Sequence, residues 1–198
     1  MIVRYIHGIH SKEGDNNMTA LHRAMVDGGR MPAARHELFE YGFMGFWQAR
    51  WLNNDVARDL SVTSKLGRKH DEPELWVTHS NGAAVAYLAV ERFGAQPDMI
   101  INFNPALDRW RTAGVPRVET IFSGQDRWVD LAQWLPWHVW GDQGRVGYRG
   151  GLKNTLSHDA GSFSGPMAYQ DHLGAFDPKR ISAWATFVAL RAHEFLGP

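Results

Sequence analysis

Ser80 stands in a sequence context that is typical of a nucleophilic serine. The pentapeptide at 78–82, Thr-His-Ser-Asn-Gly, follows the apolar run at 75–77 and precedes the small residues at 83–86. This order predicts a buried strand, a sharp turn and a helix, which together hold a serine hydroxyl above a sheet within reach of a base. An ordinary strand–turn–helix junction with a capping serine is the alternative interpretation.

Thr78 departs from the usual G-x-S-x-G pattern, which has glycine at this position. Threonine is bulkier than glycine but still short, so we expect it to strain the turn further without forbidding it. Gly82 keeps the second glycine, which lets the strand and helix backbones approach closely. The helix N-terminus just after Ser80 offers free backbone N–H groups to a developing oxyanion.

Two backbone N–H groups are candidates for that oxyanion site. A His-Gly-Ile tripeptide follows the apolar run at 2–6 directly. A loop there can aim the Ile9 N–H at the same oxyanion that the Asn81 N–H would meet. We therefore expect these two donors to converge beside Ser80.

Asp126 is the candidate acid. It ends the turn Ser-Gly-Gln-Asp, which follows the apolar run at 118–122. A carboxylate at the end of a strand can hold a histidine in the correct tautomer and stabilise its charged form. Aspartate also forms turns for purely structural reasons, which is the alternative for Asp126, and Asp130 is a weaker candidate for the same role.

A histidine must supply the base, and in hydrolases with this kind of nucleophile the base follows the acid along the chain. We favour His172, because its loop leads directly into a helix predicted to begin near Asp177, and that helix can anchor the imidazole. His158 is the alternative, because it follows a short apolar run at 152–156 that is a candidate last strand. The histidines after Asp126 are His138, His158, His172 and His193.

Short apolar runs rich in β-branched and aromatic residues alternate with helical patterns along the chain. Continuous apolar runs suit strands covered on both faces, so the alternation predicts an α/β fold: a three-layer α/β/α sandwich with a mostly parallel sheet. Its site should lie at the C-terminal ends of the strands. The predicted strands are residues 2–6, 38–41, 75–78, 99–103 and 118–122. The predicted helices are 47–66, 83–93 and a C-terminal helix with Asp177 as N-cap, Pro178 in the first turn and an apolar stripe of Ile181, Trp184, Val188 and Phe195.

The composition allows such an enzyme and argues against other classes. The 198 residues are 44% hydrophobic, with nine Trp and ten Phe, which is enough for one domain, 1–198, with a sizeable core. Lys plus Arg and Asp plus Glu both number 21, so no basic field attracts nucleic acid or an anionic membrane. Cysteine is absent, which excludes a thiolate nucleophile and a cysteine metal site. No leader-like or membrane-spanning stretch is evident, so we expect a cytoplasmic protein.

In the order of these motifs the chain resembles the α/β-hydrolase fold proteins, and the similarity extends from the His-Gly at 7–8 to His172. The chain begins at the strand that bears His-Gly, without the family's first two strands, which implies a minimal sheet of about six strands. The resemblance implies no organic cofactor and no metal. It implies Ser80 as nucleophile, Asp126 as acid, His172 as base, and oxyanion N–H groups from Ile9 and Asn81.

We interpret the chain as a serine hydrolase that cleaves carboxylic esters or thioesters of a small acyl substrate through an acyl-enzyme. The alternatives are an amidase or peptidase with the same triad, and a non-catalytic binding protein that kept the fold. The sequence does not determine the oligomeric state.

A tryptophan-rich stretch follows the candidate acid, and its members are Trp128, Trp134, Trp137 and Trp140. An aromatic wall there, with Trp128 and Trp137 foremost, would bind an acyl chain or ring; a hydrophobic cover over the sheet is the equal alternative. His7 and His79 are expected to be structural. Asn102, Asn104 and Asn154 are expected to hydrogen-bond loops around the site, without a chemical role.

Overall fold

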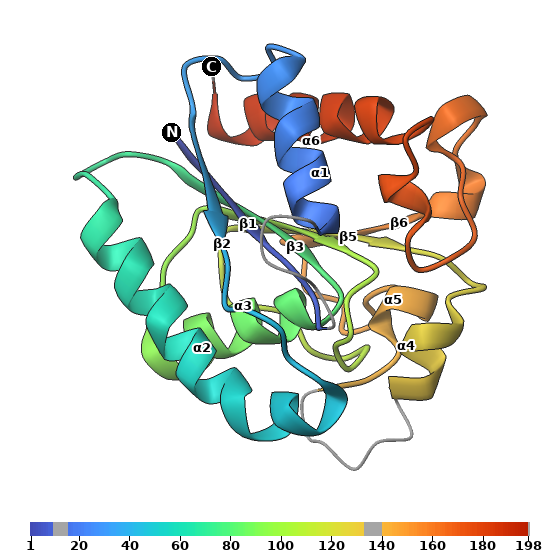
Figure 1. Ribbon diagram of the computed structural model, residues 1–198, viewed down its shortest axis with the longest axis horizontal. Coiled ribbons are helices and arrows are strands. Elements are labelled where there is room, and N and C mark those ends of the chain that lie inside the picture. The colour runs from blue at the N-terminus through green and yellow to red at the C-terminus, as the bar shows by residue number, and fades with distance from the viewer. Residues whose placement is uncertain (10–15, 133–139, 198) are drawn as a thin grey trace.

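A six-stranded sheet forms the centre of the protein, and all its strands run parallel (Figure 1). The computed structural model describes residues 1–9, 16–132 and 140–197. The strand order is β2-β1-β3-β4-β5-β6. The strands are β1 (Ile2–Ile6), β2 (Arg35–Phe39), β3 (Glu74–His79), β4 (Met99–Phe103), β5 (Arg117–Phe122) and β6 (Thr155–Asp159).

Helices cover both faces of the sheet (Figure 1). Helices α1 (Asn17–Asp27) and α6 (Ile181–Leu196) pack together on one face, and α2 (Phe46–Gly67) and α3 (Asn81–Phe93) cover the other. The predicted three-layer sandwich with a parallel sheet of about six strands is confirmed. The shorter elements are α4 (Arg127–Ala132), α5 (Gln143–Val146) and three 3₁₀ turns, Ala160–Ser162, Gly165–Met167 and Gly174–Phe176.

Strand β3 shows why residues 75–77 of the sequence form an unbroken apolar run. Leu75 and Val77 belong to the core cluster that contains Trp184 of α6, whereas Trp76 between them belongs to the cluster with Leu60 of α2. Successive side chains of a strand point to opposite faces, and both faces of this strand are buried. The continuous apolar run is therefore the signature of a central strand in a two-sided sheet.

The chain reverses its direction of travel across the sheet at β1. It passes from β1 to β2 on one side and then returns to β3 on the other side of β1. The helix that follows β1 covers one face and the helix that follows β3 covers the opposite face (Figure 1). Such a switch point opens a crevice beyond the C-terminal ends of the two strands. Ser80 follows β3 directly and Gly8 is the second residue after β1, so both lie at this switch point.

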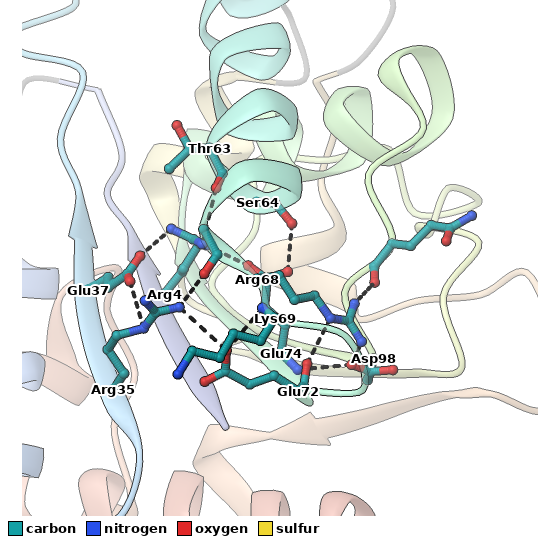
Figure 2. Close-up of polar contacts among 12 residues, drawn as sticks. Arg4, Arg35, Glu37, Thr63, Ser64, Arg68, Lys69, Glu72, Glu74 and Asp98 are labelled. Carbon is teal, nitrogen blue, oxygen red and sulfur yellow. Dashed lines mark hydrogen bonds and ion pairs between the residues drawn. The ribbon is translucent and has the colours of Figure 1, made fainter.

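A network of charged and polar side chains links α2 to strands β1, β2 and β3, away from the C-terminal strand ends (Figure 2). Arg4 of β1 is almost fully buried and pairs with Glu74 of β3 and Glu37 of β2. Ser64 of α2 donates a hydrogen bond of 2.6 Å to Glu74, and the Thr63 carbonyl accepts from Arg4 at 3.3 Å. Removing one partner of a buried pair costs about 3–5 kcal/mol, so this network is expected to anchor α2 to the sheet.

Some predicted boundaries are wrong. The strand predicted at 38–41 is Arg35–Phe39, and the candidate last strand at 152–156 is Thr155–Asp159. Helix α1 was not predicted. Asn16 caps it by accepting hydrogen bonds from the N–H groups of Met18 and Thr19 at 2.9 and 3.0 Å.

Asp177 is not the N-cap of the C-terminal helix. Its Oδ1 accepts from the Lys179 N–H at 2.8 Å, and its carbonyl accepts from the Arg180 N–H at 2.8 Å. Asp177 therefore closes a turn of its own, and α6 begins later, at Ile181, with Arg180 as N-cap. Phe195 is 43% exposed and lies outside the apolar stripe of this helix.

Within the described residues, no helix has both the length and the apolar composition that crossing a membrane requires.

Candidate active site

Ser80 forms a strained turn between β3 and α3. Its φ is 54° and its ψ is −121°, a conformation that residues other than glycine rarely adopt. Its N–H donates to the Phe103 carbonyl at 3.0 Å, and its own carbonyl accepts from Ala83 and Ala106 at 3.1 Å. These bonds hold the backbone in place and leave the side chain out of the helix cap.

The Ser80 hydroxyl makes no hydrogen bond within the described part of the chain, and it does not cap α3. The interpretation of Ser80 as an ordinary capping serine is therefore wrong. The strain at this turn lies at Ser80 itself. Thr78 keeps strand conformation within β3, and its hydroxyl donates to Asn102 Oδ1 at 2.6 Å, so the substituted threonine adds a cross-strand bond.

Two glycines let the loop after β1 approach this turn. A Cβ at Gly82 would lie 2.4 Å from the Ile6 carbonyl oxygen, and a Cβ at Gly8 would lie 2.9 Å from the Ser80 Cβ. Both distances are too short for a side chain. The backbone of the β1 loop therefore lies directly against the Ser80 turn, as the sequence predicted for the loop that carries Ile9.

The backbone N–H groups of Ile9 and Asn81 have no hydrogen-bond acceptor among the described residues. Asn81 is the first residue of α3, and its carboxamide is held by Asn53, at 2.9 and 3.0 Å, and by the Trp140 indole N–H, at 2.8 Å. The side chain is thus engaged in the core while the main-chain donor is left at the helix N-terminus, where anions are favoured.

Asp126 and His172 are brought together from distant parts of the sequence. Asp126 is fully buried, and its Oδ2 accepts from His172 Nδ1 at 2.7 Å. Its Oδ1 accepts from the N–H groups of Trp128 and Val129, each at 3.1 Å, and so caps α4. Asp126 therefore has both of the roles considered for it. One carboxylate oxygen caps the turn into α4, and the other holds the histidine.

His172 lies beside the residue that precedes Ser80. The rings of His172 and His79 are 4.6 Å apart, and His79 Nε2 donates to the His172 carbonyl at 3.1 Å. Burial, and then the proximity of His172, hold the pKa of His79 well below its usual range, so His79 stays neutral. Ser80 and His172 are not hydrogen-bonded to each other; such bonds are often long without substrate.

His7 orders the loop after β1. Its Nδ1 donates to the Gly8 carbonyl at 2.7 Å, its Nε2 accepts from the Tyr41 N–H at 3.3 Å, and its ring stacks on Tyr41 with centroids 4.0 Å apart. Burial lowers the pKa of His7, which favours this neutral form. The structural interpretation of His7 thus matches its contacts.

The structure places the alternative base elsewhere. His158 lies in β6, where its Nε2 bonds to Glu119 Oε2 at 3.0 Å and its ring packs against Phe187 of α6. His193 is in the last turn of α6. His138, Trp134, Trp137 and the Asp130 side chain lie outside the described residues.

The tryptophans after Asp126 do not share one environment. Trp128 is 57% exposed at the start of α4, whereas Trp140 is buried and holds Asn81. Trp140 therefore stabilises the Ser80 turn through Asn81. Of the predicted aromatic wall, Trp128 is a residue that the structure describes and that faces solvent. The described residues contain no cluster of three side chains suited to hold a metal ion.

Tyr169 was missed by the sequence analysis, and the role of Asn104 was only partly anticipated. Asn104 Nδ2 donates to Asp126 Oδ2 at 2.9 Å, and the Tyr169 hydroxyl donates to Asn104 Oδ1 at 2.7 Å. The pattern that could have indicated Asn104 is an Asn-Pro pair directly after a buried strand. No local signal marks Tyr169.

Comparisons with known proteins identify the fold. The chain matches no protein-family model and no curated protein. Among solved structures, Est1E from Butyrivibrio proteoclasticus aligns with 100% of this chain and 88% of its own, at 12% identity and a TM-score of 0.61.

Two further structures give the same result. Carboxyl esterase 2 from the fungus Tuber melanosporum covers 98% of this chain and 78% of its own, at 12% identity and a TM-score of 0.60. A putative hydrolase of the alpha/beta superfamily from Xanthomonas campestris covers 98% and 97%, at 15% identity and a TM-score of 0.56. The protein therefore has the α/β-hydrolase fold, and its likeness to these structures is one of fold.

Proposed function

We propose that the protein is a serine hydrolase that cleaves carboxylic esters or thioesters through an acyl-enzyme. The observation that carries the proposal is the strained Ser80 turn, with an unengaged hydroxyl, beside a histidine that is held by a buried carboxylate. A non-glycine residue in a rare backbone conformation persists only where the surrounding structure enforces it. Such strain at a strand end is a feature of a presented nucleophile.

In this mechanism His172 Nε2 takes the proton from Ser80 Oγ as the oxygen attacks the acyl carbon. Asp126 keeps Nδ1 protonated through the 2.7 Å bond and stabilises the imidazolium that forms. The N–H groups of Ile9 and Asn81 donate hydrogen bonds to the carbonyl oxygen and stabilise the negative charge that develops on it. His172 then protonates the alcohol or thiol as its bond to the acyl carbon breaks. In the second half, His172 takes a proton from the water that attacks the acyl carbon and returns it to Ser80 Oγ as the acyl–serine bond breaks and the acid leaves.

The structural neighbours support an ester substrate over other acyl compounds. They include carboxyl esterases and a cutinase-like protein from Cryptococcus, and one structure of Est1E contains ferulic acid. An exposed aromatic side chain, Trp128, adjoins Asp126 and suits an apolar acyl group. We propose Trp128 as a residue that binds the acyl group; Trp137, the other tryptophan expected to bind substrate, lies outside the described residues.

Labelling with a fluorophosphonate probe tests the nucleophile. Wild type should be labelled, and Ser80→Ala should lose labelling together with on the order of a thousandfold or more of kcat toward p-nitrophenyl esters. Ser157→Ala is the matched control, because Ser157 is an exposed serine whose Oγ only accepts from the Tyr148 N–H. Full activity in Ser80→Ala with an unchanged circular dichroism spectrum would refute the assignment.

A further inference from the structure

Asn104 is a strained, buried residue at the carboxyl end of β4. Its φ is 44°, a left-handed conformation that asparagine tolerates better than most residues. Its side chain is fully buried, and its N–H donates to the Ile121 carbonyl at 2.8 Å. The backbone is therefore held between β4 and β5, directly beside the turn that carries Asp126.

The carboxamide of Asn104 is saturated with partners. Nδ2 donates to Asp126 Oδ2 at 2.9 Å and, more weakly, to the Gly144 carbonyl at 3.4 Å. Oδ1 accepts from the Tyr169 hydroxyl at 2.7 Å. The carboxylate oxygen that receives this amide is the same one that holds His172 Nδ1.

Tyr169 lies three residues before His172 and is itself held firmly. Its ring packs edge-on against Trp184 of α6 with centroids 5.5 Å apart, and a Cβ at Gly174 would lie 2.5 Å from the Tyr169 Cβ. Burial, and then the nearby Asp126, raise the pKa of Tyr169 well above its usual range, so its hydroxyl stays a donor. The loop at 169–172 thus makes two hydrogen bonds to residues at the strand ends, one from Tyr169 to Asn104 and one from His172 to Asp126.

The orientation of the Asn104 amide follows from its two neighbours. An ionised carboxylate only accepts hydrogen bonds, so Asp126 requires the NH₂ end of the amide. A reversed amide would place a second oxygen against the carboxylate. The Tyr169 hydroxyl, acting as a donor, favours the oxygen end on its own side, and so it acts on Asp126 through Asn104.

We propose that Asn104 and Tyr169 are positioning residues that set the geometry of the Asp126–His172 pair. Asn104 fixes the carboxylate oxygen that receives the imidazole, and Tyr169 fixes Asn104 and the loop that carries the imidazole. The expected effects on catalysis rest on the proposed function. The hydrogen bond between Asp126 and His172 depends on Asn104 and Tyr169 whether or not the protein hydrolyses esters.

Tyr169→Phe removes the hydroxyl and keeps the ring. We expect kcat toward p-nitrophenyl esters to fall about tenfold with KM within about twofold, because the base is misplaced and the substrate contacts are intact. Tyr5→Phe is the matched control, since Tyr5 is fully buried and its hydroxyl bonds to His36 Nδ1 at 2.8 Å. An unchanged kcat in Tyr169→Phe, or an equal fall in Tyr5→Phe, would overturn the proposal.

A double-mutant cycle tests whether Tyr169 acts through Asn104. Asn104→Gly removes the carboxamide, and glycine adopts the positive φ without strain. In that background Tyr169→Phe should have no further effect on kcat. If the two effects instead multiply, the hydroxyl acts on the site by another route and the proposed chain of contacts is wrong.

Proton NMR separates this inference from the proposed function. The measurement uses Ser80→Ala protein, in which the Asp126–His172 hydrogen bond is retained and no activity is needed. The His172 Nδ1–H resonance, assigned by its loss in His172→Gln, should move upfield and exchange faster with water when Tyr169→Phe or Asn104→Gly is added. An unchanged resonance in both variants would refute the positioning role, whatever the esterase assays show.

Discussion

Two histidine–carboxylate pairs in this protein look alike and differ in what surrounds them. His172 bonds to Asp126 at 2.7 Å, and His158 bonds to Glu119 at 3.0 Å. Both carboxylates are buried. The first pair lies in loops beyond the C-terminal ends of the strands, whereas the second lies between β5 and β6 under α6.

Glu119 is saturated with cations. Arg191 of α6 reaches it at 2.9 Å, and Arg117 reaches it at 3.0 Å from the same strand. Burial by itself would raise the pKa of Glu119, but the hydrogen bonds from His158 and from the two arginines lower it to about 2. Because arginine already neutralises this carboxylate, the imidazole is one donor among several and its role is to join the strands and α6.

Asp126 has no arginine or lysine partner among the described residues. It receives a carboxamide and two backbone N–H groups, all neutral, so the His172 imidazole is the one group bonded to it that can become positively charged. A base must gain a proton during the reaction. A carboxylate that has no other cationic partner stabilises the resulting imidazolium most. The comparison shows that the partners of the acid distinguish a structural pair from a candidate catalytic one.

The largest expected effect comes from exchanging the two histidines for alanine. His172→Ala should lower kcat by more than about ten-thousandfold, because the proton acceptor is lost. His158→Ala should keep kcat within a few-fold and lower the unfolding free energy by about 1–2 kcal/mol. Ester hydrolysis and urea unfolding of the two purified variants measure this; the reverse ranking of activities would assign the base to His158.

Replacing the two carboxylates should give the same contrast: the Asp126 variant loses activity and the Glu119 variant loses stability. The loss of activity should be smaller than in His172→Ala. Asp126→Asn should lower kcat by roughly 10³–10⁴, since the amide cannot stabilise the imidazolium. Glu119→Gln should leave kcat per folded molecule nearly unchanged and destabilise the protein by about 3 kcal/mol, because the buried carboxylate that two partly buried arginines contact loses its charge. The comparison fails if Glu119→Gln, measured where it is fully folded, is as inactive as Asp126→Asn.

The smallest effect is a pH dependence of stability that belongs to Glu119 alone. Its folded pKa, about 2, lies below the ordinary value of 4.5. Its contribution is therefore complete above pH 4.5 and is lost as the pH falls from 4.5 toward 2, up to roughly 3 kcal/mol. Unfolding free energies at pH 3 and pH 6 should differ less in Glu119→Gln than in wild type. Equal differences would remove Glu119 as the source.

The sequence by itself determined the class of fold and the place of the Ser80 turn. Burial on both faces makes a central strand mostly apolar, so β1 and β4 were predicted at their observed bounds. The Ser80 turn was predicted because strand, turn and helix follow one another within a few residues. These features depend on local periodicity, which a sequence displays directly.

Only the tertiary structure decided which carboxylate each histidine meets. His158 and His172 both follow Asp126 in the chain, and the sequence favoured His172 only through the helix predicted after its loop. The register of β6 beside β5, which pairs His158 with Ile121, puts its imidazole beside Glu119. The loop before α6 brings His172 to Asp126 across 46 residues. Contacts of this range depend on how the layers pack, as does the bond from Tyr169 to Asn104, and packing leaves no periodic signal in the chain.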